Sequence, residues 1–205
     1  MVIAKAPVPG RVKTRLTPVY SPEEAARLAE AALIDTLGAV LATPVGRRVL
    51  VLDGAPGDWL TSGIEVVPQC GGGLDARLAH AFGLCEGEGP VLLIGMDTPQ
   101  VTPELLGRGL ELSAGEAAFG PADDGGFWAL GLAEPDPALL RGVPMSVPET
   151  GAVQRRRLDL AGLTVRELPV LRDVDTAEDA RLVAAEAPLT RFASTLAALA
   201  RTGAR

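Results

Sequence analysis

The chain has 205 residues, enough to bury a full core and ordinarily one domain, so residues 1–205 are expected to form a single domain. Its 19 Lys and Arg against 26 Asp and Glu give a net charge of -7, which excludes a general attraction to nucleic acid or to an anionic membrane. Two cysteines, Cys70 and Cys85, form no ligand pattern and are too few for a disulfide framework, which argues against zinc and favours a reducing compartment.

The first residues, Met1–Ala4, are too short to be the apolar region of a signal peptide. No later stretch reaches the roughly 18 unbroken apolar residues that a membrane span needs. We therefore expect a soluble cytoplasmic protein with no membrane partner and no nucleic-acid partner.

Short apolar runs alternate with helical patterns along the chain, which is typical of a mainly parallel sheet covered by helices. This alternation predicts an α/β fold, a three-layer α/β/α sandwich built on one sheet. The expected strands are Val2–Ala4, Val49–Leu52, Ile64–Val67, Val91–Ile94, Ala117–Phe119, Phe127–Leu132 and Leu163–Leu168.

Capping residues mark where helices should begin. Ser21, followed by Pro22 and by Glu24 at the third helical position, forms a capping box. Thr102 and Thr176 open two further helices in the same way. Helical spacing of apolar residues predicts two more helices, through Leu74, Leu78, Phe82 and Cys85 and through Leu189, Phe192, Leu196 and Leu199.

The loop after the first strand carries a cluster of cations with no acidic residue among them. Residues 5–16 read Lys-Ala-Pro-Val-Pro-Gly-Arg-Val-Lys-Thr-Arg-Leu. Cations this close repel one another unless an anion lies among them, and the forked arginine side chain matches phosphate oxygens. We interpret the loop as a diphosphate or triphosphate site, against the alternative of a solvated basic loop. The residues expected to form this site are Lys5, Gly10, Arg11, Lys13, Thr14 and Arg15.

Acidic residues follow three later strands, at the strand ends where ligands of a parallel sheet bind. Asp97 is placed to hold Mg²⁺ or Mn²⁺, or else forms an Asx turn. Asp123 and Asp124 precede two glycines that would let the backbone approach a ligand closely, or else form a plain hairpin turn. Asp173 and Asp175 can supply a second metal ligand, stabilise the N-terminus of the next helix, or do both.

Two weaker features lie in the middle of the chain. The glycine-rich turn at residues 69–73 leads into a predicted helix and suits recognition of an anion or a base by backbone N–H groups. His80 is the only histidine, and no GxSxG elbow accompanies it, so we interpret it as a structural or surface residue.

Taken together, four of these motifs resemble a bacterial family with the glycosyltransferase-A type fold, in the nucleotide-diphospho-sugar transferase superfamily. The resemblance extends over nearly the whole chain. The first motif is also similar to a loop of molybdenum-cofactor guanylyltransferases and 2-phospholactate guanylyltransferases. The motifs are Lys-Thr-Arg-Leu at 13–16, Gly-Met-Asp-Thr-Pro at 95–99, Gly-Pro-Ala-Asp-Asp-Gly-Gly at 120–126 and Asp-Val-Asp-Thr at 173–176.

The resemblance implies roles for particular residues. The sequence departs from the family at Phe127, where a tyrosine is common, and Asp97 stands in place of a full Asp-x-Asp motif. By this resemblance, Arg11, Lys13 and Arg15 would bind phosphate, and Asp97 and Asp175 would coordinate Mg²⁺ or Mn²⁺. Lys13 and Asp124 would be catalytic, with Asp124 facing the acceptor or the surroundings of the metal. Arg77 would bind the nucleotide.

Three functions are compatible with these residues. The favoured one is a metal-dependent transferase that moves a sugar from a nucleotide diphosphate sugar to a small-molecule acceptor. The alternative is a nucleotidyltransferase, in which an acceptor phosphate attacks a nucleoside triphosphate and pyrophosphate leaves. A third possibility is a nucleotide-binding protein without turnover, because the expected metal ligands are sparse.

Overall fold

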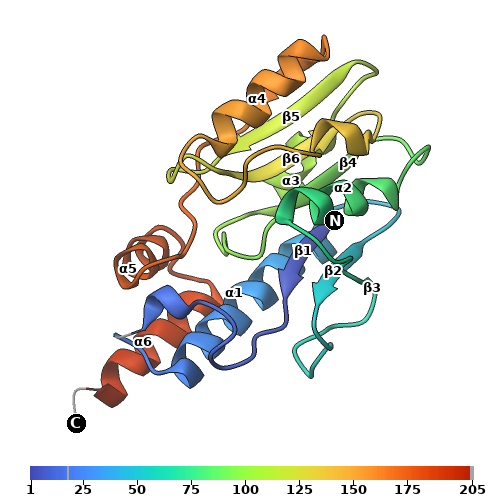
Figure 1. The fold of residues 1–205 in the computed structure, drawn as a ribbon. Coiled ribbons are helices and arrows are strands. Elements are labelled where there is room, and N and C mark those ends of the chain that lie inside the picture. Colours follow the sequence, from blue (N-terminus) through green and yellow to red (C-terminus); the bar gives the residue numbers. More distant parts are fainter. Residues whose placement is uncertain (18, 204–205) are drawn as a thin grey trace.

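A computed structural model describes residues 1–17 and 19–203, so residue 18 and residues 204–205 of the expected domain lie outside the described residues. Within that part, seven strands form one sheet in the order β3-β2-β1-β4-β6-β5-β7 (Figure 1). All seven predicted strands are confirmed, with some ends moved by one or two residues. The strands are β1 (Val2–Lys5), β2 (Val49–Asp53), β3 (Glu65–Pro68), β4 (Val91–Ile94), β5 (Glu116–Pro121), β6 (Phe127–Leu132) and β7 (Thr164–Glu167).

The sheet is mainly parallel, as the sequence predicts, and it reverses direction at one strand. β6 runs antiparallel to both of its neighbours, β4 and β5, whereas the other described neighbours are parallel. The connection from β5 to β6 spans residues 122–126, which is too short for the crossover that a parallel pair needs. The start of β6 therefore lies beside the carboxyl end of β4.

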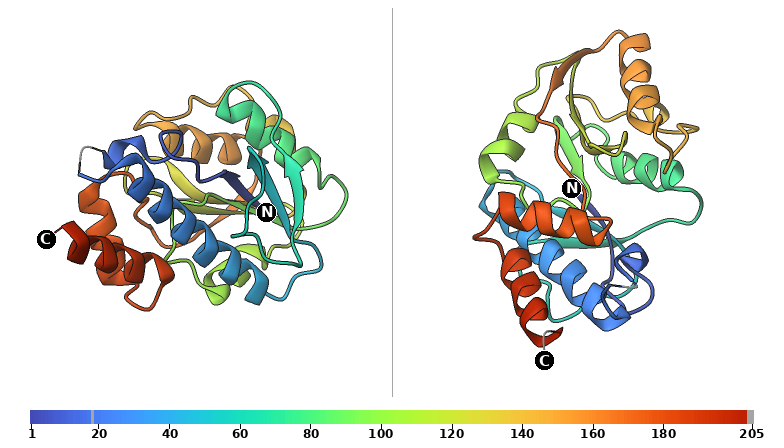
Figure 2. Two further views of the ribbon diagram at one scale, coloured as in Figure 1. Left: turned by 90° about the horizontal axis from the view of Figure 1, so that it is seen from below. Right: turned by 90° about the vertical axis from the view of Figure 1, so that its left-hand side faces the viewer.

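Helices cover both faces of the sheet and give the molecule the expected three layers (Figure 2). One face carries α1 (Pro22–Ala42) and α3 (Pro103–Leu110), and the other carries α2 (Leu74–Gly83) and α4 (Thr150–Leu160). Side chains alternate along each strand, so neighbouring residues of β2 contribute to the two different apolar cores. None of the helices in the described residues is long and apolar enough to cross a membrane.

Two C-terminal helices, α5 (Ala177–Glu186) and α6 (Arg191–Gly203), pack outside α1 and enclose a third apolar cluster (Figure 1). The predicted helix through Leu189 is correct from Phe192 onward but wrong at its start, because Leu189 lies before α6 and is 99% exposed. The start of α6 is set by Asp35 of α1, whose carboxylate accepts hydrogen bonds from the backbone N–H groups of Arg191 at 2.9 Å and Phe192 at 2.7 Å.

The helix starts predicted at Ser21, Thr102 and Thr176 are all confirmed, and each side chain accepts a backbone N–H of its helix. The stripe that begins at Leu74 forms α2, which ends at Gly83, so its last member, Cys85, is buried just beyond the helix. The sequence reading missed α4, because its inward positions include small and polar residues and give no apolar stripe. Two short 3-10 turns, η1 (Thr14–Leu16) and η2 (Pro137–Leu139), complete the described elements.

Candidate functional site

A cleft of about 780 Å³ opens at the carboxyl ends of β1 and β4, where ligands of open parallel sheets bind. Its walls come from the loop after β1, the start of α2, the turn after β4, the start of β6, the loop before α4 and the segment before α5. The sequence-predicted residues that line it are Lys5, Arg11, Lys13, Thr14, Arg15, Arg77, Asp97, Asp124, Asp173 and Asp175. Gly10 is not among its lining residues and instead makes the turn in the basic loop, with a φ of 74°.

The centre of the cleft is an ion-pair cluster around Lys13. Its Nζ lies 2.7 Å from Asp97 Oδ1 and 3.3 Å from Asp175 Oδ1, and its side chain is only 9% exposed. Arg15 Nη1 contacts the other oxygen of Asp175 at 2.8 Å. Lys13 adopts a left-handed backbone conformation with a φ of 48°, which is unfavourable for a residue with a β-carbon. The surrounding contacts hold this conformation and direct the ammonium group between the two carboxylates.

One backbone contact brings residues that are distant in the sequence together in this cluster. The N–H of Val174 donates a hydrogen bond to the carbonyl of Asp97 at 2.9 Å. This contact places Asp173 and Asp175 beside the end of β4, on either side of a buried valine. Because side chains alternate along an extended segment, the two carboxylates of the Asp-Val-Asp motif both line the cleft while Val174 between them points into the core.

Electrostatics in the cluster shift two pKa values in the same direction. Burial lowers the pKa of Lys13, but Asp97 and Asp175 outweigh burial, and the net shift is upward. Burial, together with the charge of Asp97, raises the pKa of Asp173 to about 7, although Lys13 opposes this shift. Asp173 Oδ1 is buried without a hydrogen-bond partner in the described structure. The cleft thus holds one charged lysine and one carboxyl group that readily keeps its proton.

The paired carboxylates after β5 separate in the fold. Asp124 lines the cleft, and its Oδ1 accepts a hydrogen bond from the N–H of Gly126 at 2.8 Å. Asp123 turns away and pairs with Arg172 Nη2 at 2.6 Å. The tight turn requires Gly125, which has a φ of 89°, and a β-carbon there would lie 2.1 Å from the carbonyl oxygen of Pro148. The two alternatives for this motif therefore coexist, because Asp124 both forms the tight turn with Gly126 and lines the cleft, whereas Asp123 faces away.

Arg77 enters the cleft from the first turns of α2. Its Nη1 donates to Gln69 Oε1 at 3.1 Å, and its Nε is buried with no hydrogen-bond partner in the described residues. Gln69 in turn donates through Nε2 to the carbonyls of Ala4 at 2.7 Å and Val51 at 3.1 Å. Gln69 belongs to the glycine-rich turn singled out in the sequence, but the sequence assigned it no role of its own.

The carboxylates of the cleft offer oxygens to a divalent cation without forming a complete site. No group of three or more metal-type side chains in the described residues has a ready-made metal geometry. Asp97 and Asp175 nevertheless aim one oxygen each at the same point, now taken by Lys13 Nζ, and Asp173 adds a buried oxygen without a partner. Carboxylate oxygens are the ligands that Mg²⁺ and Mn²⁺ prefer. The residues fit a hard cation held by two carboxylates and otherwise by ligand or water oxygens.

The seven-stranded α/β sandwich with its cleft at the carboxyl ends has the fold of the nucleotide-diphospho-sugar transferases. A family model matches residues 36–147, more than half of the chain, and the chain belongs to that family, described as "Uncharacterized protein conserved in bacteria (DUF2064)". No curated protein sequence matches the chain.

Solved structures with the same fold include one close in shape along its whole length. A protein from Desulfovibrio desulfuricans G20, described as a candidate nucleotide-diphospho-sugar transferase, is 28% identical, with a TM-score of 0.85 over 99% of this chain and 94% of that chain. The 2-C-methyl-D-erythritol 4-phosphate cytidylyltransferase of Thermus thermophilus is 18% identical, with a TM-score of 0.56 over 92% of this chain and 98% of that one. A CMP:2-keto-3-deoxy-manno-octonic acid synthetase complexed with CTP is 15% identical, with a TM-score of 0.58 over 92% of this chain and 98% of that chain. The last two similarities establish the fold alone.

Proposed function

We propose that this protein is a metal-dependent transferase that uses a nucleotide-activated donor, and that it transfers a sugar from a nucleotide diphosphate sugar to a small-molecule acceptor. The observation that carries the proposal is the position of Lys13, between two carboxylates and next to further cations of the same loop. The description of the Desulfovibrio structure, a candidate transferase of this kind, supports the same class of reaction. Both cysteines are free thiols, which is compatible with a cytoplasmic setting.

In this proposal the basic loop binds the diphosphate of the donor. Arg11 has no ion-pair partner among the described residues and lines the cleft, so it is available to a phosphate. Arg15 is already held in the cleft by Asp175, which limits the entropy that it loses on binding. Lys13 lies beside the same carboxylate and can turn from it toward a phosphate. Lys5, Thr14 and Arg77 line the same part of the cleft and add further hydrogen-bond donors.

Asp97 and Asp175 would hold Mg²⁺ or Mn²⁺ once Lys13 turns toward the phosphates. A bound cation would neutralise charge on the diphosphate as it leaves the sugar. The chain itself positions the donor through its cations and keeps the reacting carbon near the turn that carries Asp124. Lys13 stabilises the negative charge that builds on the leaving oxygen, and Asp124 accepts the proton of the attacking hydroxyl.

Nucleotidyl transfer is the second candidate, favoured by the density of cations in the loop. Under that reaction the same residues would bind a triphosphate and stabilise departing pyrophosphate. A nucleotide-binding protein without turnover is the third candidate, and it would bind nucleotides independently of a divalent cation.

A thermal-shift screen tests the proposal, because a ligand that binds the folded state raises the melting temperature. Nucleoside diphosphates, triphosphates and nucleotide sugars are each added with Mn²⁺ or with EDTA. We expect stabilisation that needs Mn²⁺ and is lost in Arg11→Ala and Asp97→Asn but not in Arg108→Ala, an exposed arginine on α3 outside the cleft. Hits are then incubated with acceptors, where release of a nucleoside diphosphate supports glycosyl transfer and release of pyrophosphate supports the alternative. The proposal fails if no nucleotide shifts the melting temperature.

A further inference from the structure

The cleft divides into two halves that differ in charge. The five cations among its described lining residues all come from β1, the loop after it and α2, and they are Lys5, Arg11, Lys13, Arg15 and Arg77. Asp97, Asp173 and Asp175 come from the turn after β4 and the segment before α5, and the ammonium group of Lys13 lies between Asp97 and Asp175. The remaining half is bounded by the start of β6 and the loop at residues 144–150, and it contributes the carboxylate of Asp124 but no cation.

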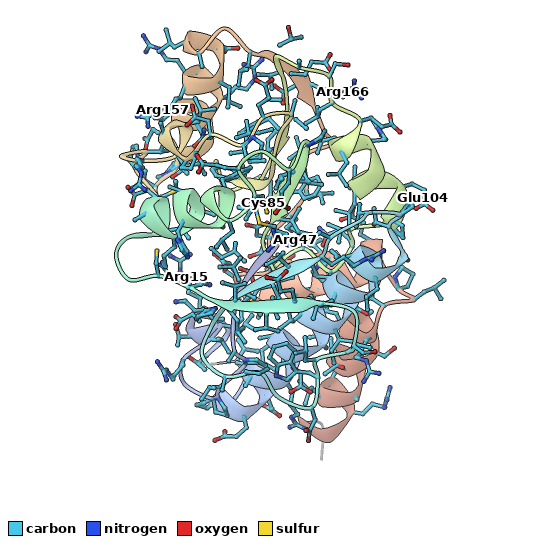
Figure 3. All side chains as sticks on the ribbon, turned by 90° about the vertical axis from the view of Figure 1, so that its right-hand side faces the viewer. Arg15, Arg47, Cys85, Glu104, Arg157 and Arg166 are labelled. Atoms are coloured by element: carbon cyan, nitrogen blue, oxygen red, sulfur yellow. The ribbon has the colours of Figure 1, made fainter. Side chains whose placement is uncertain are left out.

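Basic residues near the second half do not reach it. Arg157 of α4 donates to the carbonyl of Arg141, and Arg155 pairs with Asp159 and Glu167. Arg157 is not among the residues that line the cleft, and in Figure 3 it lies in the upper part of the molecule, well above Arg15. Arg172 pairs with Asp123 and Asp179 and does not line the cleft. An anionic group in this half would meet the carboxylate of Asp124, and the described residues that line this half include no cation to compensate its charge.

The wall of the second half is apolar and preformed. Phe127 is half-buried and packs against the buried ring of Phe119, with ring centroids 5.7 Å apart. Met145 packs on the same apolar core, and Val147 is 39% exposed. An aromatic ring and aliphatic side chains that line the same cleft are suited to cover the apolar face of a ligand.

Hydrogen bonds hold the loop at residues 144–150 in place without any ligand. The hydroxyl of the buried Thr150 donates to the carbonyl of Pro144 at 2.9 Å and accepts the N–H of Val147 at 3.2 Å. The N–H of Gly151 donates to the carbonyl of Gly125 at 2.8 Å, which ties the loop to the turn that carries Asp124. The apolar wall and the carboxylate therefore form one unit.

We infer that this second half, which we call the acceptor half, binds an uncharged hydroxyl compound with an apolar face. The inference rests on the proposed function and adds the chemistry of the acceptor. An acceptor oxygen forms a bond to the transferred sugar carbon while the bond from that carbon to the diphosphate oxygen breaks. The hydroxyl proton passes to Asp124, and the nucleoside diphosphate leaves with the bonding electron pair on the side of the cations. An acceptor phosphate would lack a counter-ion here, so transfer goes to an alcohol.

Two probes that share a phenyl group test the inference, namely phenyl β-D-glucopyranoside, which is uncharged, and phenyl phosphate. Each is titrated by calorimetry into protein saturated with Mn²⁺ and the nucleoside diphosphate that gave the largest thermal shift. We expect the glucoside to bind at least tenfold more tightly than phenyl phosphate, and Phe127→Ala to weaken it at least fivefold. Val147→Lys supplies the missing cation and should raise the affinity for phenyl phosphate at least tenfold. Val170→Lys, a matched change at an exposed valine outside the cleft, should leave both affinities unchanged.

The outcomes separate this inference from the function on which it rests. If nucleoside diphosphate binds but phenyl phosphate binds as tightly as the glucoside, the acceptor half is not selective for uncharged ligands and the inference is wrong. Failure of both probes to bind would also overturn it. If no nucleotide binds in the first place, the proposed function falls, and the acceptor assignment falls with it.

Discussion

The ammonium group of Lys13 lies 2.7 Å from Asp97 Oδ1 and 3.3 Å from Asp175 Oδ1, at the point where a cation held by both carboxylates would have to sit. The lysine and a divalent cation therefore compete for the same oxygens. This relationship makes Lys13 an internal counter-ion in the absence of nucleotide. It also predicts that phosphate and metal bind together, because phosphate attracts the ammonium away from the carboxylates.

Replacing Lys13 with methionine removes the counter-ion but keeps the aliphatic stem. We expect Lys13→Met to lower the free energy of unfolding by about 2 kcal/mol in EDTA, because the carboxylates lose their partner but stay partly exposed to water. Mn²⁺ should raise the melting temperature of the variant more than that of the wild type. Thermal denaturation with and without Mn²⁺ measures both effects, and Lys5→Met, at an exposed lysine of the same loop, is the control. Equal stabilisation of variant and wild type by Mn²⁺ would contradict competition.

The raised pKa of Asp173 makes the stability of the folded protein depend on pH. Its pKa is raised in the folded protein to about 7, so between its ordinary value and pH 7 the folded state binds its proton more tightly than the unfolded state does. Its contribution to stability is fully present below its unfolded pKa and is lost as the pH rises toward 7, by up to about 1.4 kcal/mol per pH unit. Asp173→Asn removes this titration. In EDTA, the melting temperature of the variant relative to the wild type should therefore increase from pH 5 to pH 8. A difference that does not change with pH would show that Asp173 is ionised throughout.

Much of the fold could be predicted from local sequence signals. Strands with continuous apolar runs and helices with capping boxes, such as the one at Ser21, depend on a few neighbouring residues, and these elements were found. α4 was missed because Gln154 is buried through a hydrogen bond to the carbonyl of Leu139, a tertiary contact that no periodicity reveals. The start of α6 was misplaced for the same reason, since Asp35 fixes it from a distant helix.

For the candidate site, the sequence predicted which residues line the cleft but not which side chains contact one another. Carboxyl ends of parallel strands share one edge of the sheet, which is why Asp97 could be placed in the cleft from its position after a strand. Asp175 joins it through the segment after β7, where the N–H of Val174 donates to the carbonyl of Asp97, a contact that the sequence does not reveal. The ion pair of both carboxylates with Lys13 depends on a left-handed backbone conformation that nothing in the local sequence requires. Met145 joins the cleft through a long loop, so its place there could not be predicted from its neighbours.

The attachment of α6 depends on Asp35, which accepts two backbone N–H groups in the first turn of that helix. Asp35→Ala leaves both donors without their acceptor, and we expect a loss of about 1–2 kcal/mol in the free energy of unfolding. The amides of Arg191–Gly203 should exchange hydrogen faster, while those of the central strands are affected less. Asp35→Asn keeps one acceptor oxygen and should retain part of the protection. Unchanged exchange in α6 would mean that apolar packing alone fixes the helix.

Gly125 joins the turn that carries Asp124 to the loop of the acceptor half, and the chain offers a matched control for it. A β-carbon at Gly125 would lie 2.1 Å from the carbonyl oxygen of Pro148, whereas at Gly115, which has a similar positive φ, it would meet no atom within 4 Å. Both alanine variants carry the strain of a left-handed residue, about 1–2 kcal/mol. Gly125→Ala must in addition push residues 144–150 away, so we expect it to lower the free energy of unfolding in urea by at least about 2 kcal/mol more than Gly115→Ala does. Equal losses would mean that the loop moves freely, and the acceptor half would then not be preformed.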